Sequence, residues 1–177
     1  MRLIDGTPEE IAEFLRLTEG GRSAEAEEPD AADLESAAEP AGGKLDWDRI
    51  AQFVQGRARS NDIARRVTSF LRGALELGDV EIGPGASERT TDGLTDYVMV
   101  HDAGVRRFGA VAYVQAKNGG LTLRLTRQDV SGMNVSGIQF RDVRPGHQYV
   151  VNCQLRDDES VATALKLVST ALAKVRA

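Results

Sequence analysis

Residues 107–126, RFGAVAYVQAKNGGLTLRLT, alternate between apolar and polar side chains on both sides of an Asn118-Gly119 pair. Alternation with period two is typical of strands with one buried face. Asn-Gly is a favoured two-residue turn between such strands because both positions tolerate positive φ. The sequence therefore predicts a β-hairpin with a type I′ turn. Its expected buried face comprises Phe108, Ala110, Ala112, Val114 and Ala116 before the turn, and Leu121, Leu123 and Leu125 after it.

The other face of this hairpin is polar, and a predicted strand over residues 147–155 continues it. In that strand we expect Tyr149 to face the core together with Val151, Cys153 and Leu155. A sheet face with basic, amide and aromatic side chains can bind single strands or phosphates, whereas a solvated or helix-covered face is the alternative. The predicted polar face comprises Arg107, Tyr113, Gln115, Lys117, Thr122, Arg124, Gln148, Asn152 and Gln154.

Three helices are predicted from apolar stripes at helical spacing and from capping residues. The first begins at Asp46 and ends at Gly56, and the second is capped by Ser60 or Asn61 and stopped by Gly78. The third follows a cap at Asp157 or Asp158. The remaining strands are predicted over 80–82, 97–101 and 138–143, with a break at Gly83-Pro84-Gly85 and a loop over 129–137. The predicted fold is α+β: an antiparallel sheet of about five strands, with the C-terminal helix and the preceding helical pair packed on it.

The charge is divided unevenly along the chain. Residues 1–43 contain 3 Arg against 12 Asp and Glu, a net charge of −9, whereas residues 44–177 have a net charge of +4. We predict a short N-terminal arm over 1–18, a flexible acidic linker over 19–43 and a single domain over 44–177. The arm contains a capping box at Thr7 and a short helix over 7–17 that is expected to dock on this domain, on a second copy of the chain or on a partner.

The sequence also restricts the cellular context. It shows no signal peptide and no run of about 18 apolar residues, and its single cysteine, Cys153, cannot form an internal disulfide. These features predict a cytoplasmic protein that is not in a membrane. Arginine outnumbers lysine 18 to 4, as is typical of a bacterial genome of high GC content.

The two helices before the sheet carry a group of arginines. Residues 50–67 resemble a helix-turn-helix, since a glycine turn leads into a helix that opens with Ser-Asn and carries basic side chains. The turn over 56–61 is longer than is usual for that motif, so a plain helical hairpin is the alternative. The candidate anion-binding residues here are Arg57, Arg59, Arg65, Arg66 and Arg72.

One local pattern resembles the active site of Mrr-type restriction endonucleases, which have an aspartate on one strand and Gln-x-Lys on the next. The matching residues are Asp96, Gln115 and Lys117. The resemblance implies that Asp96 ligates Mg²⁺, Gln115 assists, and Lys117 stabilises developing charge. In that family the lysine strand leads into a helix, whereas Lys117 here precedes a hairpin turn.

A broader resemblance covers residues 107–175, which are similar to an uncharacterised α+β domain associated with predicted nuclease and restriction proteins. Most of the matching residues belong to the predicted core, so the resemblance implies the fold and a nucleic-acid-associated accessory role. They are Phe108, Val111, Leu121, Leu123, Leu125, Arg141, Asp142, Val143, Asp158, Ser160, Ala164 and Leu165.

The sequence favours a non-enzymatic binding module without a cofactor, whose partner is nucleic acid or a protein. Two alternatives remain open. One is a metal-dependent nuclease of the restriction type, which would use Mg²⁺. The other is an assembly protein that docks through its N-terminal helix, and the sequence does not define an oligomeric state.

Overall fold

A computed structural model describes residues 47–86, 94–104 and 110–177, without the side chains of 84–86 and 94–96. The predicted N-terminal arm, its docking helix over 7–17 and the acidic linker over 19–43 lie outside the described residues. The same holds for Arg107 and Phe108 of the predicted hairpin.

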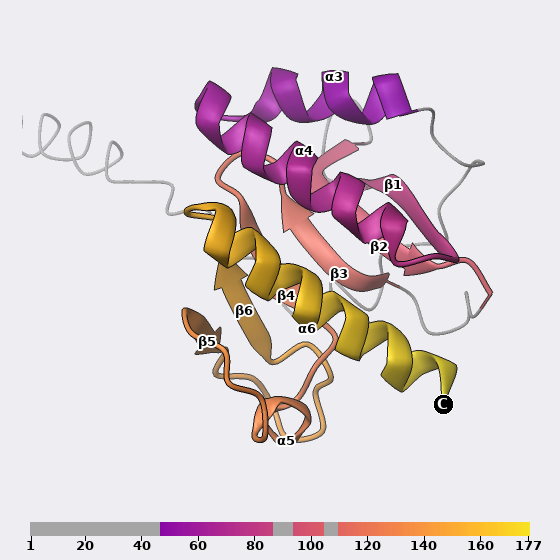
Figure 1. The fold of residues 1–177 in the computed structure, drawn as a ribbon, viewed down its shortest axis with the longest axis vertical. Coiled ribbons are helices and arrows are strands. Elements are labelled where there is room, and N and C mark those ends of the chain that lie inside the picture. The colour runs from indigo at the N-terminus through magenta and orange to yellow at the C-terminus, as the bar shows by residue number, and fades with distance from the viewer. Residues whose placement is uncertain (1–46, 87–93, 105–109) are drawn as a thin grey trace, which may run out of the picture. The chain divides into compact units, whose positions relative to one another are not determined.

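The described residues form one antiparallel sheet of six strands in the order β1-β2-β3-β4-β6-β5 (Figure 1). The predicted α+β class is confirmed, with six strands in place of about five. Helices α4 and α6 cross one face of the sheet (Figure 1). The strands are β1 (Val80–Ala86), β2 (Leu94–Asp102), β3 (Ala110–Gln115), β4 (Gly120–Leu123), β5 (Ile138–Phe140) and β6 (Val151–Gln154). The helices are α3 (Trp47–Arg57), α4 (Asn61–Glu76), α5 (Arg127–Val130) and α6 (Asp158–Arg176).

The helix ends follow the local capping signals. Ser60 caps α4 by accepting the Ile63 N–H at 3.3 Å. Gly78 follows the C-cap of that helix, Leu77, and ends it with a φ of 78°. Asp157 caps α6 in a capping box with Ser160. Both predicted caps are confirmed. Helix α3 continues to Arg57, so only residues 58–60 separate it from α4, and the predicted longer turn is wrong.

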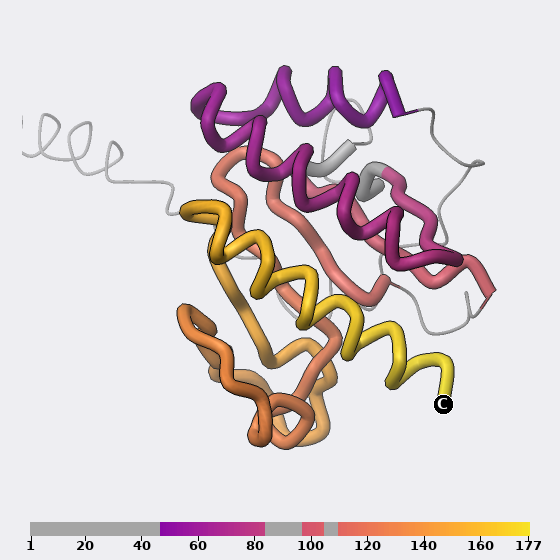
Figure 2. Tube along the Cα trace, in the orientation of Figure 1, coloured from indigo at the N-terminus to yellow at the C-terminus, as the bar shows by residue number. Residues whose placement is uncertain are grey.

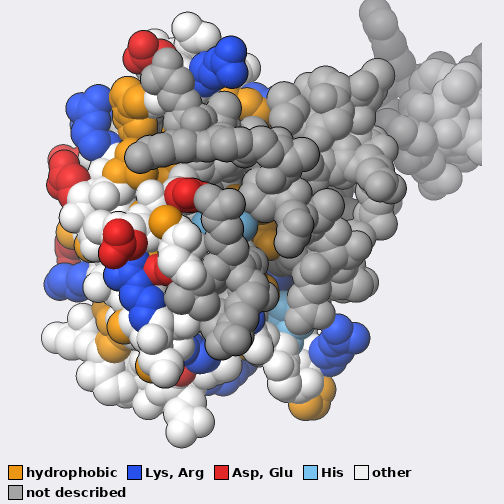
Figure 3. Space-filling model, turned by 90° about the vertical axis from the view of Figure 1, so that its right-hand side faces the viewer, with side chains coloured by type: hydrophobic (Ala, Val, Ile, Leu, Met, Phe, Trp, Pro, Cys, Tyr) orange, Lys and Arg blue, Asp and Glu red, His pale blue; other side chains and the backbone are white. Residues whose placement is uncertain are grey.

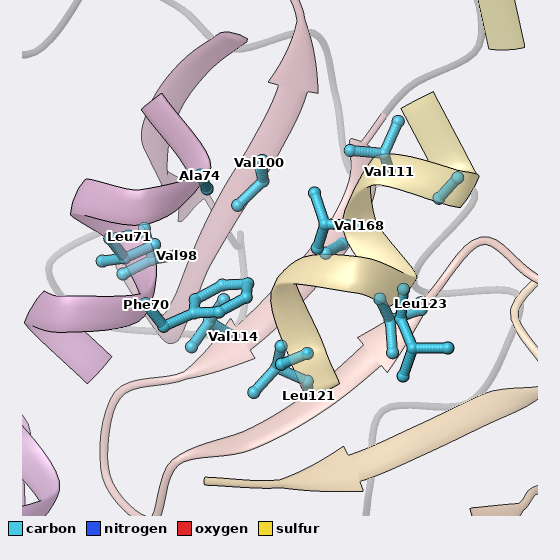
Figure 4. Packing of buried hydrophobic residues seen from close by; sticks show 14 of the residues in the cluster. Phe70, Leu71, Ala74, Val98, Val100, Val111, Val114, Leu121, Leu123 and Val168 are labelled. Atoms are coloured by element: carbon cyan, nitrogen blue, oxygen red, sulfur yellow. The ribbon is translucent and has the colours of Figure 1, made fainter. Parts of the chain in front are cut away.

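The core lies between the sheet and the helices. Figure 4 shows side chains of α4 and α6 packed over side chains of β2, β3 and β4. The labelled residues of this cluster are Phe70, Leu71, Ala74, Val98, Val100, Val111, Val114, Leu121, Leu123 and Val168. Burial of such side chains is the main stabilising contribution for a sheet that is covered on one face.

The predicted hairpin is confirmed, but its turn is not type I′. A type I′ turn needs positive φ at both Asn118 and Gly119. Only Gly119 has it, with a φ of 75°, and Asp79 is the one described non-glycine residue with positive φ. The Gly119 N–H donates to the Gln115 carbonyl at 2.8 Å, which closes a longer loop over residues 116–119.

A β-bulge in β3 changes which side chains face the core. Val100 pairs with Ala112, and the next residue, His101, pairs with Ala110, so Val111 is the extra residue in β3. Val111 consequently joins the core, and Ala110 turns to the opposite face. The prediction that Ala110 shares a face with Ala112 is therefore wrong.

Tyr149 is also on the face opposite to the one predicted. The predicted strand over 147–155 is regular only within β6, Val151–Gln154, and Tyr149 precedes that stretch. It packs against Tyr113 and Ala110, and its hydroxyl donates to the Ala110 carbonyl at 2.7 Å. The bulge and this contact together form a small second cluster on the face away from the helices.

Three further boundaries differ from the prediction. Strand β1 runs through Gly83-Pro84-Gly85, because an edge strand tolerates proline. The register of its pairing with β2 shifts between Pro84 and Ala86. The predicted strand over 138–143 ends at Phe140, and the predicted loop over 129–137 begins inside α5. No described helix is long and apolar enough to cross a membrane.

Phe70 offers a test of the core. Its side chain is fully buried between α4, α6 and the sheet. We expect Phe70→Ala to lower the free energy of unfolding by about 3–5 kcal/mol, because it removes buried apolar surface and leaves a cavity. Urea unfolding followed by circular dichroism would measure the change. Ser69→Ala, on the exposed side of the same helix, should change it by less than about 0.5 kcal/mol. Equal effects of the two substitutions would contradict this core.

Candidate nucleic-acid interface

Two turns meet at one end of the sheet and bring three basic residues together. The Arg59 backbone N–H, in the turn between α3 and α4, donates to the Lys117 carbonyl, in the turn between β3 and β4, at 3.0 Å. Arg57 is the last residue of α3 and lies two positions before Arg59. Figure 2 shows both turns on the side where α6 also begins. We call Arg57, Arg59 and Lys117 the turn cluster.

Two arginines of the helix pair are held against aromatic rings. The Arg57 guanidinium lies 4.6 Å from the centroid of the Phe53 ring, and the Arg72 guanidinium lies 5.0 Å from that of Trp47. Such stacking uses the flat face of the guanidinium, so its N–H edges keep the geometry that binds phosphate. Both arginines were predicted as candidate anion-binding residues, whereas their aromatic partners were not predicted. Phe53 and Arg57 are four residues apart in one helix, so their contact can be predicted from the sequence. Trp47 and Arg72 are 25 residues apart in different helices, so their contact depends on how the helices pack.

The helix pair has more basic than acidic side chains. From α3 to the end of α4 six arginines stand against three carboxylates: Arg49, Arg57, Arg59, Arg65, Arg66 and Arg72 against Asp48, Asp62 and Glu76. Elsewhere the charges are mixed. On the face shown in Figure 3, basic and acidic side chains of the described residues are interspersed, without a large patch of one sign. The residue count therefore assigns an excess of positive charge to the helix pair.

Arg65 and Arg66 are partly neutralised by the start of α6. Arg65 lies 4.0 Å from Asp62 and 3.9 Å from Asp158, in exposed pairs that contribute little to stability. Hydrogen bonds from the backbone and side chain of Ser160 lower the pKa of Asp157, and the positive charge of Arg66 lowers it further. These two arginines thus have carboxylates of this chain beside them, which makes Arg59 and Lys117 the better candidates for an external anion.

The predicted aromatic on the sheet face is not accessible. Tyr113 is only 4% exposed, and its ring meets those of Tyr97 and Tyr149 edge to face at centroid distances of 6.5 and 5.4 Å. The Arg124 guanidinium lies 5.6 Å from the Tyr149 ring centroid. A base cannot stack on Tyr113 in this arrangement, so we leave Tyr113 and Arg124 out of the interface.

Two of the residues that resemble the nuclease site, Gln115 and Lys117, do not belong to the same strand. Gln115 is the last residue of β3, whereas Lys117 lies in the turn that follows. Asp96 is in β2, and its side chain lies outside the described residues. In the part of the chain that the structure describes, no three His, Cys, Asp or Glu side chains are grouped so that they could hold a metal ion. Burial raises the pKa of the Cys153 thiol to about 12, so this cysteine stays protonated and is not a nucleophile.

Comparisons with known proteins supply no relative. No protein-family model, no curated protein and no solved structure matches this chain. Both resemblances noted from the sequence therefore stay predictions.

The cap of α6 beside Arg66 provides a pH test. Because the pKa of Asp157 is lowered in the folded protein, its ionised form stabilises the fold above the ordinary aspartate pKa of 3.8, and this contribution is lost as the pH falls through the lower folded value. We expect the wild type to lose more stability between about pH 5 and about pH 3 than Asp157→Asn, since asparagine caps a helix without titrating. Urea midpoints at the two pH values would measure this. Equal losses in both proteins would contradict it.

Proposed function

We propose that this chain is a non-enzymatic binding module that holds the phosphate backbone of nucleic acid at the turn cluster. The observation that carries the proposal is the hydrogen bond from the Arg59 N–H to the Lys117 carbonyl. It fixes two turns from distant parts of the chain against each other, so that the backbones of Arg59 and Lys117 lie side by side. Preorganised cations of this kind suit an anion that repeats along a strand.

The start of α4 adds to the positive potential at this site. Arg59 immediately precedes Ser60, the N-cap of a 16-residue helix. The N-terminus of such a helix carries a partial positive charge and backbone N–H groups that favour phosphate. Asp62 in the first turn reduces this potential, but it is already close to Arg65.

The stacked arginines extend the site along the helix pair. Arg57 belongs to the turn cluster itself, and Arg72 lies about three turns along α4 from Ser60. Arg72 is exposed, and its stacking on Trp47 reduces the conformational entropy that binding would cost. A nucleic acid that follows α4 would meet positive charge at both ends of the helix.

The short turn between α3 and α4 bears on the kind of nucleic acid. Its three residues match the length found in helix-turn-helix motifs. Helix α4, however, buries Ala64, Val67, Phe70, Leu71 and Ala74 against the core. Only its outer side is free for contact, so we propose backbone binding rather than insertion of α4 into a major groove.

A salt titration tests the proposal. Fluorescence anisotropy with labelled single-stranded and duplex DNA, from about 50 to about 200 mM salt, should show affinity that falls with salt. Arg59→Ala and Lys117→Ala should each weaken binding for every sequence, and each should lower the slope of log affinity against log salt by roughly 0.7–0.9, the value for one lost phosphate contact.

Lys166→Ala is the matched control. Lys166 is exposed on α6 and is not part of the turn cluster. Its substitution removes the same unit of charge as Lys117→Ala. It should leave the affinity within about twofold of the wild type, because under the proposal Lys166 contacts no phosphate. Absence of binding at the lowest salt, or an equal effect of Lys166→Ala and Lys117→Ala, would show that the proposal is wrong.

A further inference from the structure

An exposed aromatic side chain lies at the edge of the sheet. Strand pairing places Val100, Ala112, Leu123, Val151 and Phe140 in one row across β2, β3, β4, β6 and β5. The first four are fully buried, whereas Phe140 is 39% exposed, and no other large apolar side chain in the described part of the chain is exposed. Figure 1 shows β5 beside α6 rather than beneath it. Phe140 therefore continues the core row beyond the part of the sheet that the helices cover.

A guanidinium lies over this ring and is positioned by α5. The Arg127 guanidinium is 4.5 Å from the centroid of the Phe140 ring. Arg127 is the first residue of α5, a one-turn helix that is closed by a capping box between Thr126 and Asp129. Asp129 also contacts Lys174 at 2.6 Å, which joins α5 to the last turn of α6. Both members of the contact thus sit on anchored backbone, and we call Phe140 and Arg127 the edge pair.

The chain around the edge pair is basic. Residues 124–147 contain four arginines and two aspartates, which gives a net charge of +2 with histidine neutral. One of these aspartates, Asp129, is already paired with Lys174. Arg127 is exposed and has no carboxylate partner among the described residues. The exposed ring is therefore surrounded by charge that attracts an anionic partner.

An exposed ring with an arginine over it matches an unpaired nucleotide. A base offers a flat face that stacks on aromatic rings and on guanidinium planes, and its phosphate pairs with the neighbouring cations. A second copy of this chain is the other occupant that an edge strand attracts. The strand β5 has only three residues and so offers few backbone hydrogen bonds, and the net positive charge around it repels a like-charged copy. The charge and the ring together favour the nucleotide.

The edge pair is close enough to the turn cluster for one strand to reach both. Gly120 follows the turn that contains Lys117, and it pairs with Gln154 of β6. Phe140 pairs with Val151, three residues along β6 from Gln154, and lies one strand beyond β6. Ordinary strand spacings of about 3.4 Å per residue and about 4.8 Å between strands place Phe140 about 14 Å from Gly120. This separation lies within the footprint of several nucleotides that is usual for single-strand binding.

We propose that an unpaired base stacks on the edge pair while the phosphates of the same strand are held at the turn cluster. This inference rests on the proposed function and specifies its substrate as single-stranded nucleic acid. A duplex keeps the faces of its bases covered by neighbouring base pairs, so it can use the turn cluster but not the edge pair. The chain then binds single strands more tightly than duplexes of the same sequence.

Fluorescence anisotropy tests the inference with one labelled DNA oligomer, single-stranded and as its duplex, at one low salt concentration. We expect Phe140→Ala to weaken single-strand binding at least about fivefold, the lower end of what stacking of a base contributes, and to leave duplex binding within about twofold. Phe140→Tyr keeps the ring and should retain the wild-type affinity. In Phe140→Trp, tryptophan emission should fall when the single strand binds, with the wild type, whose single tryptophan is Trp47, as the background.

Gln139→Ala is the matched control. Gln139 is an exposed neighbour in the same strand, and its row faces the opposite side of the sheet. It should leave both affinities within about twofold of the wild type.

Three results would overturn the inference. Equal effects of Phe140→Ala and Gln139→Ala on the single strand, or an equal loss for single strand and duplex in Phe140→Ala, would remove the edge pair and leave backbone binding at the turn cluster intact. A mass in solution that falls from dimer to monomer in Phe140→Ala would assign the edge to an interface between copies. Failure of the wild type to bind either form of the DNA would overturn the proposed function, and this inference with it.

Discussion

Burial of one face of the sheet under α4 and α6 is the constraint on which the rest of this structure depends. The row Val98, Val114, Leu121 and Cys153 runs across four strands on that face, and Phe70 of α4 packs against the same cluster. Because strand side chains alternate, this row determines that the neighbouring row points away from the helices. Gln115, Gly120 and Gln154 lie on the row that faces away from the helices only because the core row is apolar throughout.

Local signals were sufficient wherever one residue decides the structure of its neighbours. The caps at Ser60 and Asp157 and the stop at Gly78 could be predicted because capping depends on side chains within three or four positions. The buried positions Leu121, Leu123 and Leu125 followed from alternation, which survives in β4 because that strand is regular. The α+β class followed from these elements together.

Alternation fails where the ladder is irregular. A single extra residue, Val111, moves Ala110 to the other face, and no residue type in that stretch signals the bulge. Tyr149 lies on the same face as Ala110, since the hydroxyl of Tyr149 donates to the Ala110 carbonyl. The turn cluster was predictable only in part. The arginines are visible in the sequence, but the approach of Arg59 to Lys117 depends on how the helix pair packs against the hairpin.

The two glycines after Asn118 are explained by different physical constraints. Gly119 has a φ of 75°, and a turn accounts for it fully. Gly120 lies in the regular ladder of β4, with no positive φ, where glycine costs stability and any strand-forming side chain would be expected. The backbone gives no reason for glycine at this position. The surroundings of the missing Cβ give one. A Cβ atom here would lie 3.1 Å from Asn118 Oδ1, which accepts the Gly120 N–H, so this oxygen would have to shift.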